Sequence, residues 1–257
     1  AFYNADGISE MHIPASVVAI DYYAFAMCDS LRTVTFAEDN NLKGVYEGAF
    51  YGCKNLSDIM LPDSIVEISD FAFYGCEALA YIPMGHTALT AVGNHAFTNC
   101  AALLGLELPA TVESLGFAML EGCGALESLT LPFVGGSRLG AVSDSEADTA
   151  YLGYIFGAEE YVFTAGYLPA ALISVTLQEG CGDIPANAFF ECASIREIIL
   201  PEGVITIGRR AFYGCKKLQD IQLPEGLTTI GHYAFYGCAG LTEITIPEGL
   251  ATINQYT

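Results

Sequence analysis

The stretch LQDIQLPEGLTTIGHYAFYGCAG, residues 218–240, contains every part of a unit that recurs along the chain. Its pentapeptide AFYGC stands at residues 49–53, 72–76, 211–215 and 234–238. A catalytic pocket needs its parts once or twice. A pentapeptide that recurs at a regular distance instead indicates a structural part that packs on copies of itself.

The pattern LxxIxLP sets the period of the chain. Its successive starts lie 23 to 25 residues apart, apart from one interval of 46 between Leu126 and Leu172, which is twice 23. A degenerate repeat is therefore expected inside that interval, at LGYIFG from Leu152, which brings the total to eleven strand-bearing repeats. The ten clear starts are Ile8, Leu31, Leu56, Leu79, Leu103, Leu126, Leu172, Ile195, Leu218 and Leu241.

The unit predicts one strand and one turn per repeat. Apolar and polar residues alternate within LxxIxLP, the pattern of a half-buried strand, and the proline that follows lacks an N–H and ends the ladder. AFYGC is expected to form a compact turn or a single helical turn. Because 23 residues cannot bury their apolar face alone, stacked units share a continuous core. We expect one repeat solenoid over residues 1–257, with an irregular repeat and insertion at 133–171.

Composition and charge exclude several classes of function. The chain has 257 residues, 53% of them apolar, and a net charge of −21, which repels nucleic acid and anionic membrane surfaces. No apolar run approaches the roughly 20 residues that span a bilayer. The chain lacks an initiator methionine and a signal peptide, and both of its ends fall within a repeat. We therefore expect either a trimmed piece of a longer array or exposed ends that pair between molecules.

Eight cysteines share one position of the repeat and are expected to form a structural column. Parallel Cβ directions argue against disulfides within this column, and the absence of Cys-x-x-Cys pairs argues against zinc, so buried thiols are expected. Cys181 stands outside the column, and its pairing with Cys192 is left open. The column consists of Cys28, Cys53, Cys76, Cys100, Cys123, Cys192, Cys215 and Cys238.

The full unit, CxxLxxIxLPxxLxxIGxxAFxxC, resembles the BspA-like class of leucine-rich repeats, and the match covers essentially the whole chain. This resemblance implies a right-handed stack with a long parallel β-sheet on one face and short turns or single helical turns on the other. It also implies an extracellular or cell-surface bacterial module that adheres to host or bacterial surfaces. The implied partner is an unknown protein or glycan, with no nucleic acid, no membrane insertion and no cofactor.

The outward positions of the strands are the first candidate for partner binding. Three successive positions are acidic: Glu197, Asp220 and Glu243. Their charges either attract a cationic partner or calcium, or serve only to prevent aggregation of the sheet. We interpret the surface as a whole as partner-binding. The candidate residues are Glu10, Asp58, Tyr81, Glu107, Glu197, Asp220 and Glu243.

Two further segments are candidates for contact with a partner. Five of the nine basic residues fall within 22 positions and form either a docking patch or charge compensation: Arg196, Arg209, Arg210, Lys216 and Lys217. The insertion at 133–150 carries alternating acids, which are Asp144, Glu146 and Asp148. The EF-hand pattern is excluded there, since the sixth position lacks glycine and the twelfth is Ile155.

A row of tyrosines follows the phenylalanine of AFY in several repeats. These tyrosines either stack on a ligand or cover the turn beneath them. Its members are Tyr3, Tyr51, Tyr74, Tyr213 and Tyr236.

No hydrolase, zinc-protease, P-loop or dinucleotide motif is present, so we expect no enzymatic activity. The predicted function is a binding module. The alternative is an architectural spacer within a longer array.

Overall fold

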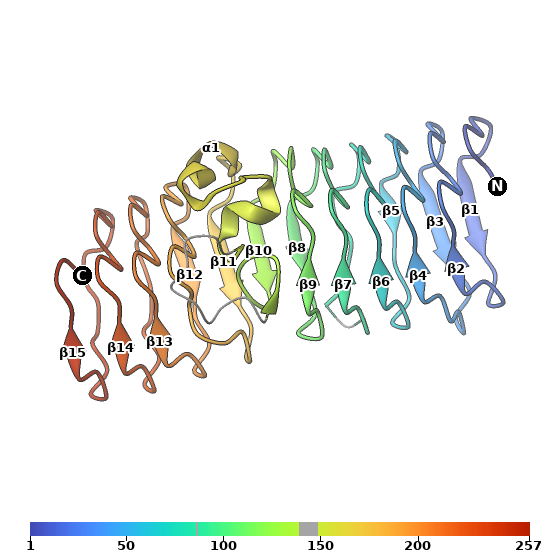
Figure 1. Ribbon diagram of the computed structural model, residues 1–257. Helices are drawn as coiled ribbons and strands as arrows, with labels where there is room; N and C mark the ends of the chain where they lie inside the picture. The colour runs from blue at the N-terminus through green and yellow to red at the C-terminus, as the bar shows by residue number, and fades with distance from the viewer. Residues whose placement is uncertain (86, 139–148) are drawn as a thin grey trace. The chain divides into compact units, whose positions relative to one another are not determined.

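The computed structural model describes residues 1–85, 87–138 and 149–257. These residues form two compact units, 1–126 and 127–257, and each unit is described by itself. Both units consist of short parallel strands that recur at the repeat period, so the predicted class of fold, a repeat solenoid with parallel sheets, is confirmed. Figure 1 shows the coils of residues 1–126, coloured from blue to green, lying side by side.

In the first unit, four of the five predicted strands lie at the LxxIxL segments, and the segment that begins at Leu79 forms no strand. Glu10 pairs with Thr33 and Thr33 with Asp58, so equivalent residues of successive repeats are in register. Val34 and Ile59 point into the core, and the residues before them point outward, as alternation requires. The strands are β1 (Glu10–Ile13), β3 (Thr33–Phe36), β5 (Asp58–Ile59) and β8 (Gly105–Glu107).

A second parallel sheet runs through the same unit, and it was not predicted. Each of its strands consists of a buried apolar residue that follows the LP turn, such as Ile68, and the residue before it, such as Glu67. The sequence analysis did not assign these residues to strands. Each strand is only two residues long, too short for alternation to be read from the sequence. The strands are β2 (Ala19–Ile20), β4 (Gly44–Val45), β6 (Glu67–Ile68), β7 (Ala91–Val92) and β9 (Ser114–Leu115).

The second unit has the same two kinds of strand. In one sheet Ser174 of β11 pairs with Ser128 of β10 and with Glu197 of β12, and in the other Thr229 pairs with Thr206 and Thr252. The first kind comprises β10 (Ser128–Leu131), β11 (Ser174–Leu177) and β12 (Glu197–Ile199). The second kind comprises β13 (Thr206–Ile207), β14 (Thr229–Ile230) and β15 (Thr252–Ile253).

The segment between β10 and β11 corrects one prediction. The strand expected at Leu152 is a 3-10 helix, η2 (Leu152–Phe156), followed by η3 (Tyr161–Phe163) and α1 (Thr164–Tyr167). Its buried residues Leu152, Ile155 and Phe156 recur at helical spacing instead of alternating, and β10 pairs directly with β11. None of the helices in the described ranges is long and apolar enough to cross a membrane.

Phenylalanines at one repeat position form a continuous stack in the core of each unit. In the first unit, the rings of Phe2, Phe25, Phe50, Phe73 and Phe97 lie nearly parallel, with neighbouring centroids 5.2 to 5.4 Å apart. In the second unit Phe189, Phe212 and Phe235 stack at 5.1 to 5.4 Å. Within each stack, aromatic contact therefore joins one coil to the next.

The AFYGC segments are turns and contain no helical residue in the described coils. Each turn places two residues in the left-handed region, for example Phe71 and Gly75 at φ 56° and 71°.

A separate column of glycines lies where consecutive coils approach each other most closely. A Cβ on Gly116 would overlap the backbone of Gly93 and Asn94, so only glycine fits there.

Candidate partner-binding site

The strand face of the second unit brings two of the predicted acidic residues together. Ser174, Glu197 and Asp220 occupy equivalent positions of three coils, because β11 pairs with β12 and a further parallel bridge joins Glu197 to Asp220. The Ser174 hydroxyl donates a hydrogen bond of 3.1 Å to Oε2 of Glu197. Glu243 is exposed and lies outside the assigned strands, so no register joins it to Asp220.

A shallow groove of about 200 Å³ runs beside these two carboxylates. Glu197, Glu202 and Asp220 line it together with Ile199, whose side chain is 46% exposed. Neither Glu197 nor Asp220 forms an ion pair with Lys or Arg in the part of the chain that the structure describes. This surface therefore presents uncompensated negative charge around an exposed apolar side chain.

A second acidic column borders the strand face of this unit, and sequence reasoning missed it. Oε1 of Glu179 accepts a hydrogen bond from the N–H of Glu202, and Oε2 of Glu202 accepts one from the N–H of Glu225, both at 3.3 Å. The signal was present in the sequence, because PEG recurs at 201–203, 224–226 and 247–249.

In the first unit, the strand face holds Glu10 and Asp58 in one register column with Thr33 between them. Asp58 lines an open groove of about 590 Å³, which also contains Met60, 66% exposed. Tyr81 is 60% exposed but lies outside the assigned strands, in a coil without a strand at that position. Glu107 is exposed at the end of β8.

The five basic residues do not share one place in the coils. Arg196 immediately precedes β12, beside the strand face, whereas the other four flank the turn at 211–215. The guanidinium of Arg210 lies 5.9 Å from the ring centre of Tyr233, so one of these charges packs against an aromatic ring. The four turn residues are Arg209, Arg210, Lys216 and Lys217.

The acids of the insertion, Asp144, Glu146 and Asp148, lie outside the described residues. Arg138, the last described residue before them in the sequence, donates a hydrogen bond of 2.6 Å to the carbonyl oxygen of Gly180. Within residues 1–85, 87–138 and 149–257, no group of three His, Cys, Asp or Glu side chains is placed to hold a metal ion.

All nine cysteines are free thiols, and Cys181 and Cys192 are not joined. Seven members of the column donate a hydrogen bond of 2.9 to 3.3 Å from Sγ to the phenylalanine carbonyl of the preceding coil. Cys192 differs, since its Sγ lies 3.9 Å from the carbonyl of Phe190 in its own coil. Leu152 occupies the phenylalanine position of the irregular coil before it, where its N–H donates to the carbonyl of Ala188.

Burial decides the chemistry of these thiols. Desolvation raises the pKa of Cys53 and Cys123 to about 12 and holds the pKa of Cys76 well above its ordinary value. The thiolate is the reactive form, so these groups stay protonated and unreactive at neutral pH. The column serves packing between coils.

We expect iodoacetamide at pH 8 to leave Cys76 and Cys100 unmodified in the folded protein and to alkylate all nine thiols in urea. Peptide mass spectrometry after timed quenching measures the modification of each residue. Cys238 is the internal comparison, because it is only partly buried and its pKa is raised to about 11. Modification of Cys76 as rapid as that of Cys238 would contradict the buried column.

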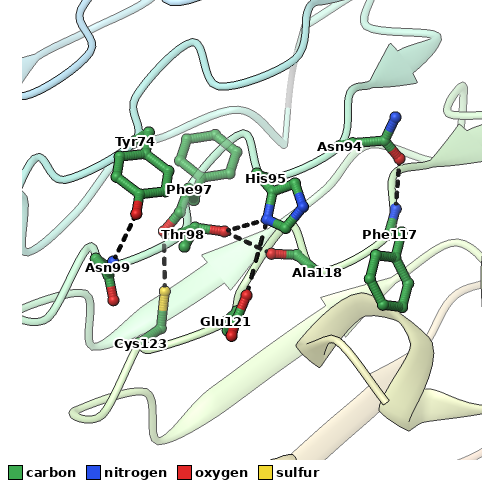
Figure 2. A network of polar contacts seen from close by, with 10 residues as sticks. All are labelled: Tyr74, Asn94, His95, Phe97, Thr98, Asn99, Phe117, Ala118, Glu121 and Cys123. Carbon is green, nitrogen blue, oxygen red and sulfur yellow. Dashed lines mark hydrogen bonds and ion pairs between the residues drawn. The ribbon is translucent and has the colours of Figure 1, made fainter. Parts of the chain in front are cut away.

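The turn face of the first unit carries a polar network around His95 (Figure 2). Nδ1 of His95 lies 3.2 Å from the Thr98 hydroxyl, which donates a hydrogen bond of 2.7 Å to the carbonyl of Ala118. Oε2 of Glu121 is 3.8 Å from the same ring nitrogen. The ring of His95 stacks on Phe71 with centroids 5.1 Å apart. Because the Thr98 hydroxyl is buried and held by a backbone carbonyl, this network joins coils and holds no accessible nucleophile.

The tyrosine row forms short stacks on the same face of the coils. In the first unit, the rings of Tyr51 and Tyr74 are parallel with centroids 4.8 Å apart. In the second unit, Phe190, Tyr213 and Tyr236 stack at 5.0 to 5.1 Å. The rings are partly exposed, so the row both covers the turns and contributes to the surface.

Comparison with known proteins agrees with this architecture. A family model described as "BspA type Leucine rich repeat region" matches in six copies over residues 1–127 and 161–257. No curated protein matches the chain.

Several solved structures resemble the chain. A leucine-rich repeat protein from Eubacterium ventriosum is 20% identical with a TM-score of 0.54, over 96% of this chain and 63% of that protein. One from Bacteroides ovatus is 20% identical with a TM-score of 0.43, over 94% and 88% of the two chains. A leucine-rich cell surface protein from Faecalibacterium prausnitzii is 26% identical with a TM-score of 0.44, over 95% and 68%. The likeness to the Eubacterium ventriosum protein is one of fold.

Proposed function

The chain belongs to the BspA-type leucine-rich repeat family, and from this premise we propose that it is a protein-interaction module of a cell-surface or secreted bacterial protein. Its role is adhesion to a host or bacterial surface, through binding and without catalysis. The partner is a macromolecule that carries positive charge where it meets the strand face. Leucine-rich repeats of this kind display a long surface on a repetitive core, which suits binding.

One observation carries the proposal. Glu197 and Asp220 stand in register on the strand face of the second unit, exposed and without a basic partner in the described ranges. They line one groove together with the exposed side chain of Ile199. A surface with charged groups around an apolar centre is the usual arrangement of a protein interface, and its negative potential accelerates association with a basic partner.

The charge of this surface predicts how binding responds to mutation and to salt. We expect Glu197→Gln, Asp220→Asn and Glu243→Gln together to weaken binding of the partner by at least tenfold, mainly through slower association. The partner is sought first by surface plasmon resonance of the immobilised protein against extracellular matrix proteins and host glycoproteins at physiological salt. Association of the unaltered protein is expected to slow as salt rises, because screening shortens the reach of the charges.

A matched control removes three charges elsewhere in the same unit. Glu159→Gln, Glu160→Gln and Glu191→Gln lower the negative charge equally, but these residues lie in the irregular segment and in a turn. Binding that falls equally in both triple variants reports net charge alone and contradicts a strand-face site. A protein that binds nothing across the panel is better described as a spacer.

A further inference from the structure

Two exposed apolar residues interrupt the polar strand face, one in each unit. Met60 and Ile199 are 66% and 46% exposed, and both occupy the fifth position of LxxIxLP, where the side chain points outward. The equivalent residue of every other described strand of this kind is polar. These polar residues are His12, Thr35, Glu107, Thr130 and Thr176.

The same two coils also share their acidic positions. Asp58 lies two residues before Met60, and Asp63 lies three residues after it. Glu197 and Glu202 stand at the same distances from the exposed isoleucine of the second unit. Of the ten clear copies of the unit, only these two combine both acids with an apolar residue between them. The two coils therefore repeat one surface pattern.

A groove lies beside each of these apolar residues. In the first unit it measures about 590 Å³ and is lined by residues of the neighbouring coils that contain β3 and β5 (Figure 1). In the second unit it measures about 200 Å³ and is lined by residues of the β12 coil and of the coil that follows. Three carboxylates line each groove, and none of the described lining residues is lysine or arginine. The carboxylates are those of Glu38, Asp58 and Asp63 in the first unit and those of Glu197, Glu202 and Asp220 in the second.

A longer loop borders the groove of the first unit. Eleven positions separate Thr33 from Gly44, whereas nine separate their register partners in the next coil. The two additional residues lie in the loop that carries Glu38. Nδ2 of the buried Asn40 donates a hydrogen bond of 2.9 Å from this loop to the carbonyl of Pro14 in the preceding coil. This wall of the groove is therefore held in place before a ligand binds, which lowers the cost of binding.

The charge of the two grooves defines the ligand that fits them. Neither Glu38 nor Asp58 forms an ion pair with Lys or Arg in the ranges that the structure describes. The same holds for Glu197 and Asp220 in the second unit. A complementary ligand therefore carries positive charge, together with an apolar side chain that covers the exposed one. Because Asp58 and Met60 are alternate residues on one face, about 6.6 Å apart, they match a basic and an apolar residue at alternate positions of an extended peptide.

We propose that the two grooves are equivalent sites for one kind of ligand: an extended segment of a partner protein in which an apolar side chain stands between two basic residues. The apolar side chain packs on Met60 in one groove and on Ile199 in the other, and the basic residues face the carboxylates. Both sites rest on the proposed function, since they lie on the strand face. They add the form of the ligand and its number, because one chain binds two such segments.

The probe is the acetylated and amidated peptide Lys-Ser-Leu-Ser-Lys, whose two basic residues and leucine share one face when it is extended. The peptide Lys-Ser-Ser-Ser-Lys has the same charge without the apolar side chain, and Glu-Ser-Leu-Ser-Glu has the opposite charge. Two-dimensional amide NMR spectra of the protein report the grooves separately, through residues 58–63 and 197–202. We expect the first peptide to shift both groups of signals saturably, and each of the other two to bind about tenfold more weakly or less.

Threonine substitutions remove the apolar side chain of one groove at a time. Met60→Thr and Ile199→Thr introduce the residue that β3, β10 and β11 carry at the same position, so both variants are expected to fold. Met60→Thr is expected to abolish the peptide-induced shifts of residues 58–63 and to leave those of residues 197–202 unchanged. Ile199→Thr is expected to have the reverse effect. Far-UV circular dichroism confirms that each variant is folded.

Val18→Thr and Ile205→Thr are the matched controls, one in each unit. Each removes an apolar side chain that is 56% or 54% exposed and lies outside both grooves, just before a strand of the second kind. Both controls are expected to leave the two sites unchanged. Three results overturn the pair of sites: shifts at only one groove, equal binding of the peptide without leucine, or equal binding of the acidic peptide.

The strand-face variant Glu197→Gln, Asp220→Asn and Glu243→Gln separates this inference from the proposed function. It is expected to abolish peptide binding in the second unit and to leave the shifts of residues 58–63 unchanged. Peptide shifts confined to residues 197–202 overturn the pair of sites but agree with the proposed function. Peptide shifts at neither groove also overturn the pair, whereas the proposed function fails only if no protein in the screen depends on the same three carboxylates.

Discussion

Replacing Phe73 with alanine is expected to lower the free energy of unfolding by about 3 to 5 kcal/mol. The ring is completely buried and lies between Phe50 and Phe97, with centroids 5.3 and 5.4 Å away. Its removal leaves a cavity in the middle of the stack and deletes two aromatic contacts at once. Because each coil of a repeat protein is stabilised mainly by its neighbours, the loss affects the coils on both sides.

Urea unfolding followed by circular dichroism measures this loss. Phe163→Ala is the matched control, because Phe163 is 54% exposed and its truncation is expected to change stability by no more than about 0.5 kcal/mol. A variant Phe73→Leu that retains much of the lost stability would indicate that volume matters more than ring stacking. Equal stability of Phe73→Ala and the unaltered protein would show that the stack does not hold the coils.

The second large effect concerns Gly116, for which alanine is expected to lower the free energy of unfolding by about 3 kcal/mol or more. A Cβ at this position overlaps backbone atoms of Gly93 and Asn94 in the preceding coil. Backbone atoms of a paired coil cannot rotate away as a side chain can, so the two coils must separate. The hydrogen bond from the N–H of Gly116 to the carbonyl of Val92, 2.8 Å long, lies at the same contact.

Gly124→Ala separates this steric effect from the general effect of adding a methyl group to a glycine. Gly124 has no atom within 4 Å of a Cβ, so its substitution is expected to be nearly neutral. Thermal unfolding of the two variants side by side makes the comparison. Equal midpoints would contradict the close approach of the coils.

The period and the class of fold were predictable because they rest on residues that every repeat needs. Val34 and Ile59 recur with their polar neighbours at the spacing of a strand, and the buried phenylalanine and cysteine follow at a fixed distance. Inward positions of this kind tolerate few residue types, so the pattern can be read in most copies. The positions of Glu10 and Asp58 in one outward column followed from the same register.

Other features depend on tertiary contacts that no local pattern records. The two-residue strands such as β6 exist because neighbouring coils supply their hydrogen bonds, and Leu152 turns into a 3-10 helix because β10 and β11 already pair.

The hydrogen bond from seven of the column cysteines to the phenylalanine carbonyl of the preceding coil has an evolutionary consequence. Any coil that ends in AFxxC offers the same acceptor and the same donor, as Cys53 with Phe25 and Cys215 with Phe189 illustrate. Unequal recombination that deletes or duplicates a whole repeat therefore restores an intact junction. Such an event leaves the interior unchanged but gives the outward residues new neighbours. The binding surface can therefore change through a series of variants that all fold.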